Sequence, residues 1–524
     1  MNAKMILVPA AAVALTACAD GPFYWRTAKY SKMTSPTAVC VQAGADFTYQ
    51  FGYEAAQPYS VKIVGYAGGD LPEKVSFDAK SGVLSGNIAK TGEFPVTFVW
   101  TNEKGESVNW GDLTIKVKNG RRHPDSLAGE TIYQLQIQGF DEEANFKGVR
   151  KHLKRLADLG VTWVYLSPIT AADRGTDRRY WSRRQRKYNN PINPYRPYDY
   201  YAVEPNYGTE ADFKALVDEA HALGMKVMID VVFFHCGPNA ALLKDHPDWV
   251  RRDAEGNPIR NEWMFPTLAI ENPELRRHLT GSLVRWTRDF GVDGYRTDCG
   301  CDTPLDYWEE CAAEVDRHRR DVVWLLEGNR SEYCTAYDIL YGFNTTMNHL
   351  QWHLDGRLPA TAIYEAWLED YAADTMLRFR GTDTHDTANN DGAMRQEKRW
   401  GHKRCEAAIA LCFALDGPAW IFQGQEIGSS APFCIFAYTA PDWSKPECPE
   451  RPALIARLAK MKKTEPAFGA RGRILWEKAR NPEEQLQFLR IAPDGGKAFR
   501  CFFDFETGDW EISECFGSRK GGLL

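Results

Sequence analysis

The sequence predicts a multidomain α/β chain: a (β/α)₈ barrel of the TIM type, preceded by a β-sandwich and followed by a small β-domain. Residues 37–118 are short alternating apolar segments separated by turn residues, a pattern typical of antiparallel strands. Residues 126–430 alternate apolar strands with amphipathic helical stretches, which predicts a parallel barrel. Residues 431–524 are expected to supply the last barrel helix and a C-terminal β-domain.

The first module is predicted to be an immunoglobulin-like β-sandwich. The stretch Leu71–Asp78, followed by Ser81–Gly86, resembles the immunoglobulin-like modules that accompany secreted enzymes. We interpret this module as a spacer, with glycan binding as the alternative. Its strand candidates are Phe47–Phe51, Ser60–Val64, Pro95–Trp100 and Leu113–Val117.

Eight strands are predicted in the barrel. Two intervening helices, Phe146–Leu159 and Phe213–Leu223, place their apolar residues on one face. A short loop domain, residues 236–271, follows the third strand. The strand candidates are Thr131–Ile137, Thr162–Leu166, Lys226–Phe233, Asp293–Thr297, Val322–Leu326, Phe343–Met347, Met376–Phe379 and Ala419–Phe422.

The N-terminal residues predict export and a lipid anchor. Residues 1–17 carry Lys4 and then an apolar run that is too short to span a bilayer, which indicates a signal peptide. The segment Leu15–Cys18 resembles the cleavage box of bacterial lipoproteins, so Cys18 is the expected lipidation site and residues 18–36 a tether. An ordinary cleaved signal with a chance cysteine is the alternative. We therefore expect a protein anchored to a bacterial membrane, on its periplasmic face or at the cell surface.

The composition excludes several classes of protein. Apolar residues make up 44% and charged residues 26% of the chain, as in ordinary globular proteins. The formal net charge of −6 argues against a nucleic-acid partner. The chain has 13 cysteines, whose pairing cannot be read from sequence. Because no cysteine and histidine spacing completes a zinc site, we expect no such metal.

Polar residues follow several predicted strands, where a barrel places its chemistry. Arg296 and Asp298 are two apart on one strand, so both should point into the barrel mouth. The guanidinium of Arg296 should keep Asp298 ionised, as a nucleophile requires. Glu327 ends an apolar strand, and such a setting raises the pKa of a carboxyl group, as a general acid requires. Two carboxyl groups in opposed environments indicate glycoside cleavage.

Four motifs occur in order along the predicted barrel: Asp230–His235, Gly294–Asp298, Glu327–Gly328 and Thr384–Asp386. Three further segments accompany them: Tyr195–Tyr200, Pro205–Gly208 and Gly417–Glu426. Together they give the chain a resemblance to the α-amylase family of retaining glycoside hydrolases, glycoside hydrolase family 13, over residues 130 to about 505.

The resemblance implies a role for each motif residue. Asp298 is implied as the nucleophile, Glu327 as the general acid/base and Asp386 as a carboxylate that stabilises the transition state. The implied substrate-binding residues are Tyr195, Asp230, His235, Arg296 and His385, with Tyr195 beneath the reacting sugar and Asp230 orienting Arg296.

The chain also departs from the family pattern. Cys301-Asp302 stands where Lys-His is common, and Thr384 replaces an Asn. Phe234 and Thr267 occupy positions whose family counterparts hold a structural calcium ion, so the resemblance implies that this chain lacks it. The segment 174–187 is rich in arginine; a solvated basic loop is one interpretation, and contact with an acidic group on a substrate or partner is the other.

These features together predict a lipid-anchored enzyme that cleaves α-glucosidic bonds in starch, glycogen or maltodextrins through a glycosyl-Asp298 intermediate. An α-glucan transglycosylase or isomerase would use the same residues, because only the fate of the intermediate differs. A non-catalytic glycan-capture lipoprotein is the alternative from another class, and the intact carboxylates Asp298, Glu327 and Asp386 speak against it.

Overall fold

The computed structural model describes most of the chain from residue 32 to residue 515. The described residues are 32–33, 38–44, 46–50, 53–54, 60–64, 74–78, 83–101, 107–118, 124–373, 376–388 and 394–515. The predicted signal peptide and the lipidation site Cys18 lie outside them.

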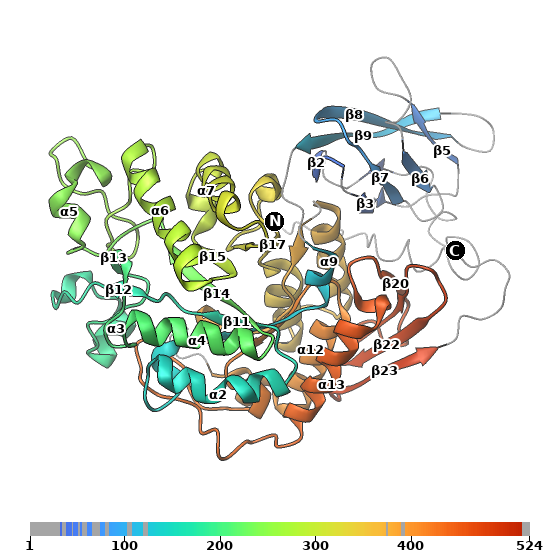
Figure 1. Cartoon of the computed structure of the whole chain (residues 1–524). Coiled ribbons are helices and arrows are strands. Elements are labelled where there is room, and N and C mark those ends of the chain that lie inside the picture. Colours follow the sequence, from blue (N-terminus) through green and yellow to red (C-terminus); the bar gives the residue numbers. More distant parts are fainter. Residues whose placement is uncertain are drawn as a thin grey trace, which may run out of the picture.

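Eight parallel strands form the central sheet, a TIM-barrel-type fold (Figure 1). Their spatial order is β18-β17-β16-β15-β14-β11-β10-β19. The two end strands are joined because the Arg380 amide donates to the Pro418 carbonyl and the Trp420 amide to the Arg380 carbonyl, each over 2.8 Å. The strands are β10 (Thr131–Leu135), β11 (Trp163–Leu166), β14 (Lys226–Val232), β15 (Gly294–Asp298), β16 (Val323–Leu326), β17 (Ile339–Leu340), β18 (Leu377–Arg378) and β19 (Ala419–Phe422).

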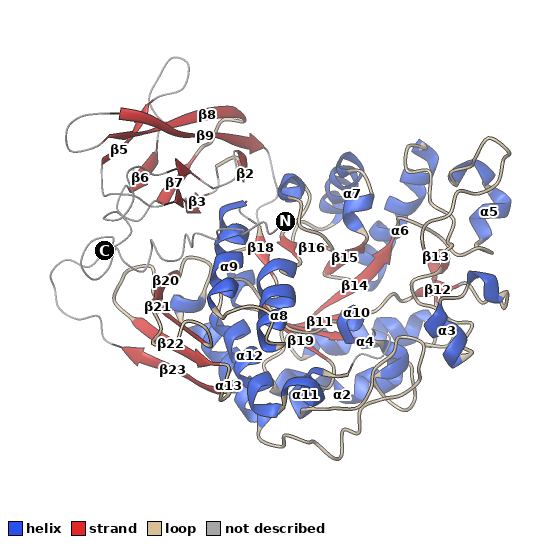
Figure 2. Ribbon diagram, turned by 180° about the vertical axis from the view of Figure 1, so that it is seen from behind, coloured by secondary structure: helices blue, strands red, loops and turns tan. Residues whose placement is uncertain are grey.

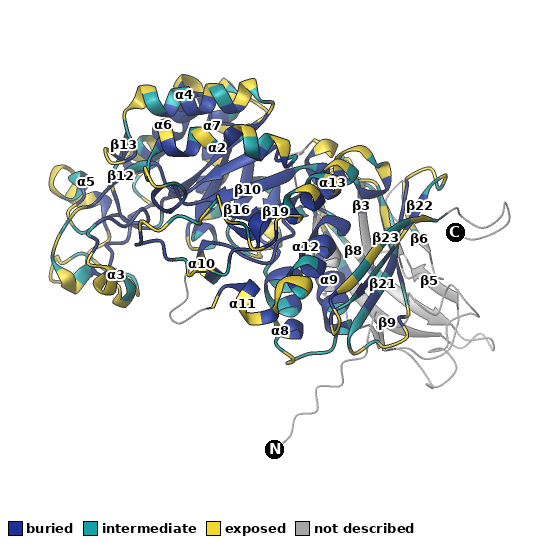
Figure 3. Cartoon of the chain, turned by 90° about the horizontal axis from the view of Figure 1, so that it is seen from below, coloured by how far each residue is buried: buried dark blue, intermediate teal, exposed yellow. Residues whose placement is uncertain are grey.

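Helices surround this sheet (Figure 2). Most of them bury one face and expose the other (Figure 3), whereas the helix over residues 402–414 buries every residue from Ala407 to Ala414. The helix α2 begins after Asn145, whose side chain accepts the Gly148 amide, and it buries Val149, Leu153 and Leu156. The longer helices are α2 (Phe146–Asp158), α4 (Glu210–Ala222), α6 (Pro273–Phe290), α7 (Leu305–His318), α9 (Thr361–Ala373), α12 (His402–Ala414) and α13 (Arg451–Thr464).

Seven of the eight predicted barrel strands coincide with observed strands, and one prediction is wrong. Phe343–Met347 is helical and continues through Leu350 into α8 (Gln351–Leu354), whereas the sixth strand is the two-residue β17 just before it. The β-branched Thr345 and Thr346 suggested a strand, but Thr345 donates its hydroxyl to Asp370 on α9 over 2.5 Å. A tertiary contact therefore overrides the local preference here.

Loops at the carboxyl ends of the strands carry short elements of their own, and those that follow β11 and β14 lie on the left of Figure 1. The second loop holds β12, α3 and β13, and α3 ends where Asn189 adopts a left-handed conformation with φ of 48°. These elements are β12 (Thr170–Ala172), α3 (Arg183–Tyr188), β13 (Pro197–Val203), α5 (Ala241–Asp245), α10 (His385–Ala388) and α11 (Gln396–Trp400).

Further sheets flank the barrel at both ends of the chain. Four strands near the C-terminus pair in sequence order: β20 (Arg473–Glu477), β21 (Gln485–Ile491), β22 (Ala498–Asp504) and β23 (Asp509–Cys515). Before the barrel, β2 (Ala38–Gln42), β9 (Ser107–Lys118), β8 (Gly92–Thr101) and β5 (Ser60–Val64) form one sheet, and β3 (Asp46–Gln50), β7 (Val83–Asn87) and β6 (Val75–Asp78) another. The strands of these sheets pair antiparallel except for β2 and β9, which pair in parallel.

The N-terminal strands contact the barrel near its active face. The strands β2 and β3 contact α9, and β2 also contacts the short helix η7 (Ser331–Thr335), which begins four residues after Glu327. Within the described part of the chain, no helix is both long and apolar enough to cross a bilayer. The eleven cysteines from Cys236 to Cys515 carry free thiols.

The buried face of α2 gives a test of the barrel core. Leu153 is fully buried, so we expect Leu153→Ala to lower the free energy of unfolding by about 2–5 kcal/mol through lost packing. Its exposed neighbour is the control: Lys154→Ala removes only a surface pair with Asp158 and should change that energy by less than about 1 kcal/mol. Urea unfolding followed by circular dichroism measures both, and equal effects would contradict this packing.

Candidate active site

A single guanidinium, that of Arg296, joins three carboxyl groups at the centre of the barrel. Arg296 is fully buried on β15, directly opposite Asp230 in the register of β14. Its Nη1 donates to Asp230 Oδ1 and to Asp298 Oδ1, each over 2.8 Å. Its Nη2 lies 2.8 Å from Glu327 Oε1. The predicted nucleophile and general acid therefore meet on one cation.

Burial raises the pKa values of Asp298 and Glu327, and the charge of Arg296 opposes the rise. For Glu327 this is the predicted direction. The expected ion pair between Arg296 and Asp298 is present. Because Arg296 is shared with Asp230 and Glu327, desolvation outweighs it in the pKa of Asp298, while the charge of Arg296 still favours the ionised form that a nucleophile needs.

The two carboxyl groups lie close together beside Cys299. One carboxylate oxygen of Asp298, one of Glu327 and the Cys299 sulfur all lie within 4.8 Å of one another. The Cys299 amide donates to Glu327 Oε2 over 2.7 Å, and Cys299 has a left-handed backbone with φ of 48°. This turn after β15 fixes one oxygen of Glu327 and leaves the other toward Arg296.

Asp230 is a buried anchor that positions its neighbours. Its Oδ2 accepts the hydroxyls of Tyr165 over 2.6 Å and Tyr195 over 2.8 Å, while Arg296 binds Oδ1. The Tyr195 ring is stacked on the ring of His385, with centroids 4.9 Å apart and planes 8° apart. These contacts hold the predicted sugar platform rigidly at the floor of the site.

His385 is neutral and held in one orientation. Burial and the charge of Arg296 lower its pKa to about 3. Its Nδ1 lies 2.7 Å from the Gln134 amide nitrogen, which can only donate, so Nδ1 accepts and Nε2 carries the proton. Nε2 lies 3.3 Å from Asp386 Oδ2. The Asp386 side chain is 57% exposed, and its charge contributes to the raised pKa of Glu327.

His235 contacts protein groups through both ring nitrogens. It is buried, its pKa is lowered to about 4 by that burial, and its Nε2 lies 2.8 Å from the Tyr195 carbonyl. Its Nδ1 lies 3.2 Å from the Asn261 amide nitrogen. His235 therefore braces the Tyr195 backbone, and its contact with a substrate stays a prediction.

Three residues that the sequence analysis missed belong to this network: Gln134, Tyr165 and Tyr341. Gln134 and Tyr165 lie on β10 and β11, and Tyr341 follows β17 and accepts Arg296 Nε over 3.2 Å. All three are fully or almost fully buried. The sequence marks these three residues only weakly. A polar residue within an apolar strand indicates a site only when its side chain is known to point into the barrel, and the sequence alone does not show this.

The residues at the family's calcium positions do not fit a calcium ion. Phe234 offers no side-chain oxygen, and the Thr267 hydroxyl already donates to the Ile259 carbonyl over 3.1 Å. Nearby, the buried guanidinium of Arg196 donates from Nη2 to the carbonyls of Asp173, Pro191 and Gly175 over 2.6, 2.8 and 3.2 Å. The positive charge of Arg196 thus binds backbone carbonyl groups of the second loop.

Comparisons with known proteins are consistent with this geometry. The family model for the α-amylase catalytic domain matches residues 94–256, a range that includes Tyr195, Asp230 and His235 and ends before Asp298. The chain is 24% identical over 380 residues to an intracellular maltogenic amylase of Bacillus subtilis, covering 66% of this chain and 59% of that protein. It is 31% identical to a cyclomaltodextrinase of Geobacillus thermopakistaniensis over 201 residues, 35% of this chain and 31% of that one.

Solved structures show the same fold. A maltogenic α-amylase from Thermotoga neapolitana superposes with a TM-score of 0.63 at 24% identity, covering 73% of this chain and 87% of that one. The chain spans only 59% of the length of the curated Bacillus subtilis relative. The family model, the curated relatives and the solved structures thus make this chain similar to α-amylase catalytic domains.

Proposed function

We propose that this chain is a retaining glycoside hydrolase that cleaves α-glucosidic bonds in starch-, glycogen- or maltodextrin-type glucans. The carrying observation is the Arg296 cluster, in which carboxylate oxygens of Asp298 and Glu327 lie within 4.8 Å. Double displacement uses carboxyl groups about 5–5.5 Å apart, whereas an inverting reaction needs about 6.5–9.5 Å to admit water. The short separation favours double displacement.

In the first step, an Asp298 oxygen bonds to the anomeric carbon as the glycosidic bond breaks, and Glu327 gives its proton to the leaving oxygen. In the second step, Glu327 takes a proton from water, the water oxygen bonds to the anomeric carbon, and the bond to Asp298 breaks. The raised pKa of Glu327 supports its part, since a general acid must hold a proton near neutral pH.

The surrounding residues would position the sugar. Tyr195, held by Asp230 and stacked on His385, provides a flat apolar face under the reacting ring. The lowered pKa of His385 keeps it neutral and Gln134 occupies its Nδ1, so its Nε2 proton, 3.3 Å from Asp386 Oδ2, would be shared between that carboxylate and a sugar hydroxyl. Asp386, exposed beside His385, would bind hydroxyls that shift as the ring flattens in the transition state.

Substitution of the two carboxyl groups tests this assignment. Glu327→Gln should lower kcat by about 10²–10⁴-fold by removing the proton donor, and Asp298→Asn should nearly abolish turnover because no glycosyl ester can form. Glu309→Gln changes an exposed carboxylate on α7 and is the matched control. Rates on maltodextrin, pullulan and glycogen, with products resolved by size, measure the effects. Wild-type turnover in either variant would refute the roles.

The enzyme is also expected to work without calcium. Phe234 and Thr267 do not offer the oxygen ligands that the ion needs, and the Arg196 cation already gathers carbonyls of the second loop. Activity and Tm should therefore stay unchanged in excess chelator. A fall in Tm of several degrees that added calcium reverses would show that other residues build a calcium site.

The lipid anchor is a separate part of the proposal and rests on Leu15–Cys18. In bacterial cells, Cys18→Ala should move the protein out of the membrane fraction, since acyl chains on Cys18 would supply the attachment. The kcat and KM on a soluble glucan should not change, because Cys18 precedes both N-terminal sheets. Retention of the variant in membranes washed with high salt would contradict the anchor.

A further inference from the structure

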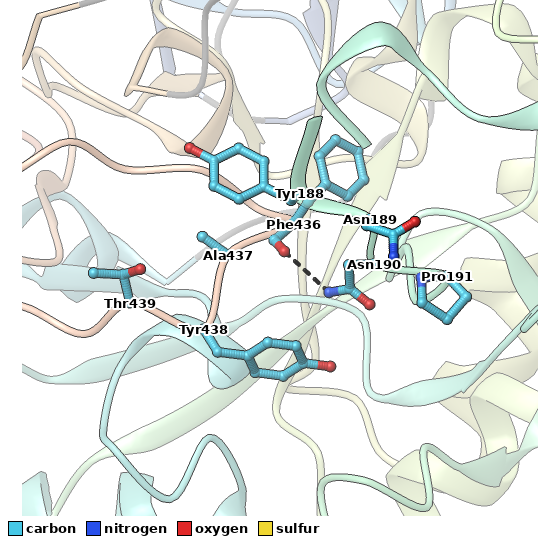
Figure 4. Close-up of a pocket in the computed structure, with 8 residues that line it drawn as sticks. All are labelled: Tyr188, Asn189, Asn190, Pro191, Phe436, Ala437, Tyr438 and Thr439. Atoms are coloured by element: carbon cyan, nitrogen blue, oxygen red, sulfur yellow. Dashed lines mark hydrogen bonds between the residues drawn. The ribbon is translucent and has the colours of Figure 1, made fainter. Parts of the chain in front are cut away.

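A second concave site lies beside the candidate active site, between the end of α3 and the loop that follows β19 (Figure 4). Its volume is about 480 Å³, within the range of about 300–1,000 Å³ typical of ligand pockets. Residues 188–191 line one side and residues 436–439 the other. None of these residues is charged, and none belongs to the Arg296 cluster.

The two walls of this pocket are tied together. The buried Asn190 donates its amide to the Phe436 carbonyl over 3.0 Å, the bond drawn in Figure 4. The Gln185 amide donates to the Asn190 carbonyl over 2.9 Å. A hydrogen bond also joins the side chains of Tyr188 and Cys434. The pocket is therefore largely preformed, so ordering its two walls would cost little of the free energy of binding.

Two tyrosine rings stand exposed in this pocket. Tyr188 is 41% and Tyr438 49% exposed, and Figure 4 shows their rings on either side of the Asn190–Phe436 bond. Exposed aromatic rings are flat apolar surfaces with a polar hydroxyl at one end. Rings combined with amide and hydroxyl groups suit a pyranose, which has an apolar face and a rim of hydroxyls. The absence of charge along the walls favours a neutral sugar over an acidic one.

One wall of the pocket packs against residues of the candidate active site. Phe436 and Ala437 belong to the same apolar cluster as Tyr195 and Val232. Tyr195 in turn donates to Asp230 and stacks on His385. One wall of the pocket thus packs against the floor on which the reacting sugar is proposed to lie.

The basic residues of α3 lie close to the pocket, but they do not favour an acidic sugar over a neutral one. Arg186 Nε donates to the Arg178 carbonyl over 3.0 Å, and Arg178 Nη2 to the Arg186 carbonyl over 2.9 Å. Lys187 Nζ lies 5.7 Å from the centre of the Tyr188 ring. Two of the arginines are thus engaged within their own loop, and no basic residue is among those that line the pocket.

We propose that this pocket is an accessory subsite that binds glucose units of an α-glucan chain away from the bond being cut. This inference rests on the proposed function. It predicts that the enzyme prefers long glucans to short ones because long chains also contact Tyr188 and Tyr438. Chains long enough to reach both the Arg296 cluster and the pocket gain the additional contact, and short oligosaccharides do not.

The test compares a long and a short substrate in full-length variants. In the double variant Tyr188→Ala/Tyr438→Ala, the ratio of kcat/KM for maltoheptaose to that for maltotriose should fall about tenfold, which corresponds to about 1.4 kcal/mol. Tyr198→Ala is the matched control, because Tyr198 is 43% exposed on β13 but does not line the pocket, and its ratio should not change. Thermal melting verifies that each variant is folded. An unchanged ratio in a folded double variant would overturn the subsite.

A binding measurement separates this inference from the proposed function. Calorimetry of maltoheptaose with Asp298→Asn should show weaker binding when the two tyrosines are also replaced. If the wild-type enzyme cleaves no α-glucan but this difference is present, the proposed function fails and the subsite stands. If the enzyme cleaves glucans and the difference is absent, only the subsite fails. Dextran sulfate serves as an acidic glucan in the same measurement. If replacing the two tyrosines weakened the binding of dextran sulfate but not that of maltoheptaose, the assignment of a neutral sugar to this pocket would be overturned.

Discussion

The buried guanidinium of Arg296 has to balance more negative charge than it carries. It lies 2.8 Å from oxygens of Asp230, Asp298 and Glu327, and attraction at such distances is strong where water is excluded. One positive charge nonetheless neutralises only one carboxylate, so burial leaves the pKa values of all three groups raised. A proton bound to one of these carboxyl groups lowers the excess of negative charge. The Glu327 side chain, 20% exposed against 12% for Asp298, is the more accessible of the two reactive groups for exchanging that proton.

The same interaction connects strands all around the barrel. In the order of the sheet, six neighbouring strands each contribute one residue, on the strand or directly after it: Gln134, Tyr165, Asp230, Arg296, Glu327 and Tyr341. Arg296 contacts Asp230 and Tyr341, and Asp230 contacts Tyr165 and Tyr195. Tyr195 stacks on His385, which Gln134 holds. Because each member orients the next, a change at one position is expected to disturb groups several strands away.

The sequence could predict the parts of this site that lie in short contiguous segments. Arg296 and Asp298 are two residues apart on one strand, and Glu327 directly follows another, so strand period and position alone place them at the barrel mouth. Contacts between distant segments were not predictable. The two ring nitrogens of His235 contact Tyr195 and Asn261, which are 40 and 26 residues away in the sequence. The pKa of Asp298 likewise depends on how many carboxyl groups share Arg296, which no local pattern reveals.

The errors in the fold have the same origin. The sixth strand has only two residues, and the predicted segment lies a few residues after it, where the β-branched Thr345 and Thr346 are helical. The pocket at Tyr188 and Tyr438 is also a product of long-range packing, since its walls are about 250 residues apart and meet through Asn190. Such walls belong to loops, which vary more readily than the strands that hold the carboxyl groups.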